Sequence, residues 1–455
     1  MKFRIVFLAT LLSCGSAHAL NVRDALMSAY KNNQDLLATR QDVLAKHEAI
    51  VQAKAGFRPT IQASAGSSIS KSRTRHYGGA PTYKGLDKRQ EGAVKLQQNL
   101  FKGFSDVAKV SQTEHDIAGL WAQLKDKEQQ LFLQVIKAYL DLYAKYAAVE
   151  VYNANLTVTR QNYESAQTKK DIGEETRTQE ALAEGKYLEA EAKLQLAKAE
   201  LEAAKATYTQ LTGEQAPEKV DRPKEIVDVP SSVETLQDLA LRENPKIKQA
   251  LEEISSAKQS KKAATGGLLP SVDLTASTSK FFNNNKTNVN NIDITTRPSE
   301  TQFNNQVGLN LTIPLYDAGS TRSQRRQASE TVIAKRINFE NVKQQIVQAC
   351  VQAYRTFVAC KINMENSSKQ VEAQQVALDG TTQEMQVGTK ILLDVLNAQA
   401  QLLQAKLDQI NTVQQYYLYM YQMLLLQGQL TAEGLQLPVE IFRPEKNYEE
   451  IKNHI

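Results

Sequence analysis

The chain has 455 residues, with 55 Lys and Arg against 50 Asp and Glu, and a formal net charge of +5. This near balance, dispersed along the chain, argues against a nucleic-acid-binding protein. The histidines lack metal-ligand spacing, and no nucleophile motif or phosphate-binding glycine loop occurs. Nothing in the sequence therefore supports an enzyme, a cofactor or a metal site.

Residues 1–19 have the features of a secretory signal peptide. Lys2 and Arg4 form a basic start, an apolar segment follows, and Ala17-His18-Ala19 is a small-x-small cleavage signal. An alternative is a lipoprotein signal with Cys14 as the lipidated residue. Without Lys2 and Arg4, 53 basic residues face 50 acidic ones, so the mature net charge is +3. No later stretch reaches 18 apolar residues, so no transmembrane helix is expected.

The mature chain is a tandem repeat with two copies of one order of parts. GFRPTIQASA begins at Gly56 and GLLPSVDLTA begins at Gly267, and later Ile172-Gly173 corresponds to Val387-Gly388. The offset is therefore 211 residues before the strands and 215 after them. The extra residues fall between two strands. We assign the repeats to 20–213 and 233–429, joined by a linker over 214–232 and followed by a tail over 430–455.

The elements follow in the same order in each repeat. The first repeat is expected to hold a helix over 21–55, strands over about 59–71 and 89–101, a long helix over about 105–170 and a short helix over about 176–212. In the second repeat a helix begins near 233, strands cover about 270–282 and 303–315, and helices cover about 320–386 and 389–428. Loops are expected over 72–88 and 283–301. Cys350 and Cys360 lie in one helix, roughly 15 Å apart at 1.5 Å per residue, which is beyond disulfide reach, and are expected to be packing residues.

The periodicities indicate what these elements do. The strands alternate with period two and are long enough, at about 40 Å, to cross an outer membrane with tilt. Each short helix carries a coiled-coil seam of 3.5-residue period. In the first copy the seam is Ala183, Tyr187, Ala190, Leu194, Ala197, Leu201, Ala204, Tyr208 and Leu211, and in the second it is Ala398, Leu402, Ala405, Gln409, Thr412, Tyr416, Tyr419, Met423 and Leu426.

Four strands cannot close a barrel, and open sheet edges are not tolerated in lipid. Several chains must therefore pool their strands. Because each hairpin interrupts a helical region, the barrel and the helices are expected to share one axis, which predicts a conduit.

The stretches GLLPSVDLTASTS (267–279), VGLNLTIPLYDAGSTRSQRRQA (307–328) and VGTKILLDVLNAQAQLLQAK (387–406) resemble the TolC-like outer-membrane efflux and secretion channels. The resemblance implies a mainly α fold with a membrane β part. It implies a homotrimer in which four strands per chain form a 12-stranded outer-membrane barrel, continuing into a coiled-coil α-helical periplasmic tunnel. It also implies a periplasmic adaptor and an inner-membrane ABC, RND or MFS transporter as partners.

The resemblance also places a periplasmic aperture at the glycine turns. In the family, two Asp residues line the narrowest ring. Here the corresponding positions are Asp394 and Asn397, with Lys390 where the family has Arg and Met385 where it has a linking Tyr. In the first copy Thr178 matches a family Thr, and Gln179 replaces an acid. The hairpin tips that would dock the adaptor are Gly173, Glu174, Val387, Gly388 and Thr389.

Three copies of Asp394 around an axis would form an anionic ring that favours cations. With one acid where the family has two, we expect weaker cation selectivity and weaker block by multivalent cations. The alternative for Asp394 is an ordinary acid in the first turn of a helix, where the helix dipole favours it.

The segment 71–89 carries Lys71, Arg73, Arg75, Lys84, Lys88 and Arg89 against Asp87. It is expected either to contact anionic lipopolysaccharide or to be a solvated loop. The leading function is a passive trimeric exit duct. The alternative is a secreted or surface coiled-coil adhesin or filament protein, which has no use for paired strands of membrane length.

Overall fold

The computed structural model describes residues 21–74, 78, 83–222, 229–289, 292–294 and 300–453. The predicted signal peptide, with Cys14, lies outside these residues. The chain divides into two compact units, and each draws on both repeats. Unit 1 comprises residues up to Asp42, Trp121–Lys248 and Asn341–Arg443, whereas unit 2 comprises Val43–Leu120, Gln249–Glu340 and the chain from Pro444 onward.

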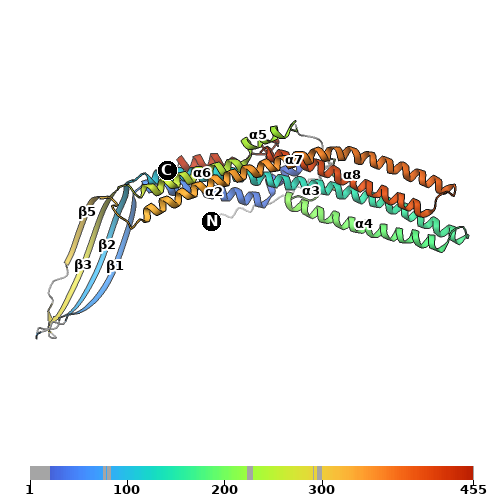
Figure 1. The fold of residues 1–455 in the computed structure, drawn as a ribbon. Coiled ribbons are helices and arrows are strands. Elements are labelled where there is room, and N and C mark those ends of the chain that lie inside the picture. The colour runs from blue at the N-terminus through green and yellow to red at the C-terminus, as the bar shows by residue number, and fades with distance from the viewer. Residues whose placement is uncertain are drawn as a thin grey trace. The chain divides into compact units, whose positions relative to one another are not determined.

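Two helical hairpins form most of unit 1 (Figure 1). The long helices α3 (Ser105–Asp171) and α7 (Ser320–Gln386) contribute their C-terminal parts, from Trp121 and Asn341 onward, and α4 (Arg177–Thr212) and α8 (Leu392–Leu426) return beside them. Tyr163 of α3 stacks on Tyr187 of α4, and Phe357 of α7 stacks on Tyr416 of α8. Since α3 also contacts α8, the helices lie in the order α4, α3, α8, α7 (Figure 1).

The coiled-coil seam of α4 packs where its period predicted. Ala183, Ala190, Leu194, Ala197, Leu201, Ala204 and Tyr208 are buried, and Tyr187 and Leu211 are half-buried. In α8 the burial is broader, because the helix carries apolar residues on more of its circumference. Of its predicted seam, Leu402, Ala405, Tyr416, Met423 and Leu426 are buried, and the other members are half-buried.

The helix expected over 21–55 is instead two helices, α1 (Val22–Asn32) and α2 (Gln34–Lys54). Asn33 breaks it, because its side-chain oxygen accepts the Leu36 N–H at 3.1 Å while its amide donates to the Leu211 carbonyl at 3.1 Å. The second copy repeats this break between α5 (Val233–Glu243) and α6 (Pro245–Gly266). There Asn244 donates to the Leu426 carbonyl at 2.9 Å, and Pro245 disfavours a helical residue before it.

Side chains of the hairpins hold the linker and the C-terminal segment in unit 1. Tyr139 and Tyr146 of α3 donate their hydroxyls to the carbonyls of Asp221 and Pro217 at 2.9 and 2.7 Å. The carboxylate of Glu128 accepts the Ala432 N–H at 2.6 Å. In unit 2, the C-terminal helix α9 (Pro444–Asn453) is reached by the ring of His47, which is 2.9 Å from the Asn447 side-chain oxygen.

Unit 2 contains an antiparallel sheet whose long strands run side by side in the order β1, β2, β3, β5 (Figure 1). They are β1 (Thr60–Thr74), β2 (Tyr83–Lys102), β3 (Ser271–Val289) and β5 (Glu300–Thr312). The short strand β4 (Ile292–Ile294) pairs with β3, and a 3-10 turn, η1 (Ala55–Phe57), precedes β1.

The loops predicted over 72–88 and 283–301 are wrong in part, because the strands extend into them. Arg73 still pairs with Lys84, and Asn283 still pairs with Glu300. Their serines, asparagines and lysines show no apolar alternation, but backbone pairing continues without it. At the other end β5 stops at Thr312 rather than near 315, because Pro314 cannot donate to the ladder.

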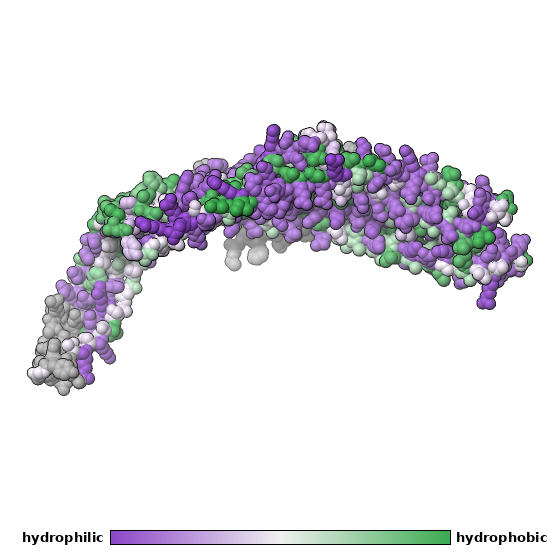
Figure 2. Space-filling view, viewed as in Figure 1, coloured by the Kyte–Doolittle hydropathy of each residue, from purple (hydrophilic) through white to green (hydrophobic). Residues whose placement is uncertain are grey.

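The sheet has two chemically different faces, since directly paired residues point to the same side. We call the side containing Ile61, Val94, Val307, Leu309 and Leu311 the apolar face, and all five are exposed. Residues between them, such as Gln62, Ser64, Gln306 and Asn310, form the polar face. Figure 2 shows hydrophobic residues gathered where β5 ends.

Within the described ranges, no helix is long and apolar enough to cross a membrane. Cys350 and Cys360 are free and buried, as predicted for packing residues. Burial raises the pKa of the Cys350 thiol to about 11.

Candidate functional site

The two glycine turns of unit 1 have the same backbone geometry. Gly173 and Gly388 have φ angles of 81° and 82°, in the left-handed region. At the first turn the Glu174 N–H donates to the Lys169 carbonyl at 2.8 Å, and at the second the Thr389 N–H donates to the Glu384 carbonyl at 2.9 Å. These six-to-one bonds are Schellman caps, which end α3 and α7 at matching positions.

The short helices that follow also begin alike. At the start of α4 the Gln179 side-chain oxygen accepts the Thr176 N–H at 3.1 Å, and the Thr176 hydroxyl accepts the Gln179 N–H at 3.3 Å. At the start of α8 the Asp394 carboxylate accepts the Ile391 N–H at 3.3 Å. Gln179 and Asp394 are therefore equivalent capping residues at the third position of their helices.

Capping accounts for one oxygen of Asp394 and leaves its charge in place. The residue is half-buried, and Asn397, one turn further along α8, is exposed. The structure thus gives Asp394 the helix-start role that was the alternative to an aperture role. The two roles are compatible, because the second oxygen remains available.

The first turn is reinforced by ion pairs between its two helices. Lys169 lies 3.4 Å from Glu175, and Lys170 lies 3.0 Å from Glu180. The hydrogen bond with Glu180 raises the pKa of Lys170. At the second turn the positions of Lys170 and Glu180 hold Met385 and Val395, so the equivalent ion pair cannot form there.

The remaining predicted aperture residues divide between core and surface. Thr178 and Lys390 are exposed, and no described acid lies within ion-pair distance of Lys390. Met385 instead packs against a core cluster of Ala166, Ala183, Leu392 and Leu396, together with Tyr163 and Leu182. These residues come from α3, α4, α7 and α8. We call them the tip cluster, and it joins the two hairpins where they turn.

Each turn also exposes an apolar side chain immediately before its glycine. Ile172 is 65% exposed and Val387 is 76% exposed, and they occupy equivalent positions in the two repeats. Ile391 and Leu393 are exposed beside them. Figure 2 shows hydrophobic residues at the end of unit 1 where the hairpins turn. Exposed apolar side chains gathered at a turn are typical of a surface that binds another protein.

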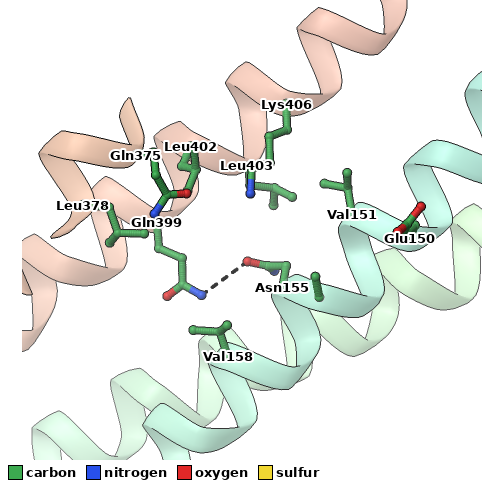
Figure 3. Close-up of a pocket in the computed structure, with 11 residues that line it drawn as sticks. Glu150, Val151, Asn155, Val158, Gln375, Leu378, Gln399, Leu402, Leu403 and Lys406 are labelled. Atoms are coloured by element: carbon green, nitrogen blue, oxygen red, sulfur yellow. Dashed lines mark hydrogen bonds between the residues drawn. The ribbon is translucent and has the colours of Figure 1, made fainter. Parts of the chain in front are cut away.

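Further from the turns, a polar network holds α8 against α3. Gln399 is buried, and its oxygen accepts from the Asn162 amide at 3.2 Å while its amide faces the Asn155 oxygen at 3.5 Å (Figure 3). A cavity of about 380 Å³ opens beside this pair and is lined by α3, α7 and α8. The network was missed from the sequence, although Asn155 and Asn162 lie one heptad apart and so share a face of α3.

The model of the family described as "Outer membrane efflux protein" matches residues 25–214 and 236–424. The outer membrane efflux protein BepC of Brucella suis biovar 1 is 29% identical over 451 residues, covering 99% of this chain and 94% of that protein. The proteases secretion protein PrtF of Dickeya chrysanthemi is 24% identical over 411 residues, covering 88% and 86%. The Campylobacter jejuni CmeC outer membrane channel superposes with a TM-score of 0.75 at 15% identity, covering 96% of this chain and 90% of that one.

Proposed function

The chain belongs to the outer membrane efflux protein family, and from that membership we propose that three copies form the exit duct of a tripartite efflux pump or a type I protein secretion system. The protein is an outer-membrane channel of the efflux and secretion type that reaches into the periplasm. The duct is passive, because its partners supply the energy.

The surfaces of the two outer helices support a ring of three copies. On α4, Leu188 and Leu196 are exposed among exposed small residues, and together they form a surface that we call the α4 stripe. The α4 stripe lies on the side of the helix opposite the buried seam. On α7, Val358, Ile362 and Val376 are exposed at a coiled-coil spacing and form the α7 stripe. Because α4 and α7 are the outer helices of the layer, the α4 stripe of one copy can pack on the α7 stripe of the next.

The open edges of the sheet support the same stoichiometry. Among the described strands, β1 and β5 each have one long partner, so their outer edges carry unpaired backbone groups. Unpaired edges are costly in lipid. Pairing β1 of one copy with β5 of the next joins four long strands per chain into twelve.

The aperture lies at the glycine turns, where the tip cluster joins the hairpins. Three Asp394 carboxylates form its anionic ring, and Asn397 faces the same passage. Gln179 forms no salt link to Lys390, because its side chain is uncharged, and its oxygen accepts the Thr176 N–H in the cap. At Met385, where the family has a linking Tyr, packing in the tip cluster replaces the polar contact. This packing keeps the aperture narrow in the closed state.

The adaptor docks on the tips formed by Gly173, Glu174, Val387, Gly388 and Thr389. Exposed Ile172 and Val387 supply the apolar contact, and the two Schellman turns present them in a rigid, repeated geometry. Docking of a periplasmic adaptor with its inner-membrane transporter opens the duct. The observation that carries this proposal is the pair of equivalent turns with apolar residues in water.

Planar-bilayer recording of the purified protein tests the duct and the aperture together. The wild type should give cation-preferring openings in a salt gradient, and Asp394→Asn should reduce that preference because it keeps a capping oxygen but removes the charge. Asp408→Asn is the matched control, since Asp408 lies on the same helix and accepts a hydrogen bond from Gln404 at 2.8 Å. Unchanged selectivity in Asp394→Asn would contradict the aperture assignment, and absence of conductance from folded protein would contradict the duct.

A further inference from the structure

We infer that the outer end of the apolar face binds the headgroup of an anionic lipid that carries more than one phosphate. The surface consists of Lys71 and Arg73 of β1, Lys84 and Lys88 of β2 and Lys280 of β3, and we call it the basic patch. The inference rests on the sheet lying in the outer membrane and adds a lipid partner to the duct.

The strand register places these five residues on one face. Arg73 pairs directly with Lys84, Lys71 pairs with Leu86, and Lys88 pairs with Ile69. Gly92 pairs with both Ala65 and Lys280, which puts Lys280 in the same set of rows. All five side chains are exposed.

Acids are segregated from the patch. In the register of the long strands, Asp87, Glu91, Asp273 and Glu300 all lie on the polar face. Among the described residues, none of the five patch cations lies within ion-pair distance of an acid.

The pairing of Arg73 with Lys84 is unfavourable by itself. Like charges directly opposite on a sheet destabilise the pair, and Lys71 and Lys88 lie in the next two rows of the same two strands. On the other face, Arg89 is compensated by Glu91 at 3.2 Å. Since no described acid balances the charge of the patch, an anion from outside the chain would stabilise it.

The spacing along the strands identifies that anion as part of a lipid. Val272, paired with Leu311, begins the apolar band, and Lys88 pairs with Asn284, 12 residues further along β3. At about 3.3 Å per residue this is roughly 40 Å along the strand, or about 28 Å across the membrane for a strand tilted by about 45°, which is just beyond an apolar band of about 25 Å. Lys280 lies nearer the band, and its ammonium is 5.1 Å from the centroid of the Phe303 ring. Acyl chains along the band would place their headgroup phosphates against the patch.

The density of charge favours a headgroup with several phosphates. Lys71, Arg73, Lys84 and Lys88 occupy three successive rows of two neighbouring strands, so adjacent members are about 5 to 7 Å apart at Cβ. One phosphate can contact two such cations, and the others then need a second phosphate on the same headgroup. A zwitterionic lipid offers no net charge to the patch.

Native mass spectrometry of the full-length protein in detergent tests the inference, with diphosphorylated lipid A as the probe and monophosphorylated lipid A for comparison. The double variant Arg73→Gln/Lys84→Gln should weaken binding of the diphosphorylated probe at least about tenfold, at roughly one kcal/mol per lost cation. The matched control is Arg89→Gln/Lys95→Gln, which removes the same charge from the polar face of the same hairpin and should stay within about twofold of wild type.

Equal losses in both double variants, or no loss in Arg73→Gln/Lys84→Gln, would overturn the basic patch. Equal affinity for the mono- and diphosphorylated probes would overturn the requirement for a second phosphate, and binding of inorganic pyrophosphate as tight as that of the probe would overturn a lipid ligand. Conductance of Arg73→Gln/Lys84→Gln separates this result from the duct, because the patch variant should still conduct.

Discussion

The tip cluster is the contact whose loss should change the protein most specifically. Leu396 is 3% exposed and packs against Ala166 of α3 and Ala183 of α4, so it joins the two hairpins. Leu396→Ala removes a nearly fully buried leucine and should cost about 3 kcal/mol. Leu393 lies one turn earlier on the same helix and is 40% exposed, so Leu393→Ala should cost less than about 1 kcal/mol.

The assay is hydrogen–deuterium exchange of the peptides that span both glycine turns. If the cluster holds the hairpins together, about 3 kcal/mol raises the population of separated tips roughly a hundredfold. Exchange should therefore accelerate at 166–183 and 385–396 in Leu396→Ala, with little change in Leu393→Ala. The same variant should show larger or longer openings in bilayers. Equal exchange in the two variants would refute the idea that this cluster holds the tips.

Three further predictions concern the turns, the thiols and the polar network. Gly388→Ala should destabilise the fold by roughly 1–2 kcal/mol and lower the unfolding temperature, because φ is 82°. Gly380→Ala, in the helical part of α7 with open space at Cβ, should stabilise the fold by up to about 1 kcal/mol and raise that temperature. Equal shifts in the unfolding temperature would contradict the turn geometry. Because burial raises the pKa of Cys350 to about 11, its thiol stays protonated at pH 8. Maleimide labelling of Cys350 at that pH should therefore be negligible until the protein unfolds. Rapid labelling of the folded protein would contradict this burial. Gln399→Leu removes both amide contacts to α3 and should destabilise the fold by about 1–3 kcal/mol. Thermal unfolding measures this loss against the control Gln401→Leu, at an exposed position. Equal shifts in the unfolding temperature of the two variants would count against the network.

Much of the fold was predictable because the sequence contains a tandem repeat and because its helices and strands have regular hydrophobic periods. The 215-residue offset placed Gly173 and Gly388 at equivalent turns, and the 3.5-residue period identified the buried side of α4. Strong periodicity survives tertiary packing because it decides which side of a helix loses water. Helical rise likewise predicted that Cys350 and Cys360 form no disulfide with each other, and both are free.

What escaped prediction depends on polar groups whose partners are distant in sequence. The helix break at Asn33 depends on a hydrogen bond to the Leu211 carbonyl, 178 residues away in the sequence, so no local sequence pattern predicts it. The strand ends around Arg73 and Asn283 carry no apolar alternation and form through backbone pairing alone. At the site, the sequence offered the first turn of a helix as one role for Asp394, but it did not predict that Gln179 caps α4 at the equivalent position.

The most direct test of the trimeric duct is a disulfide cross-link between the α4 and α7 stripes. Leu188 lies 11 residues from the start of α4 and Val376 lies 10 residues from the end of α7, so with level turns they stand roughly 17 and 15 Å from the tips. Leu188→Cys/Val376→Cys in isolated outer membranes should give dimer and trimer bands on oxidation. Lys186→Cys/Val376→Cys, with the first cysteine about 160° around α4 from Leu188 and away from the α4 stripe, should remain mostly monomeric. Monomer alone from the Leu188 pair, or equal ladders from both pairs, would contradict a ring closed by α4 and α7.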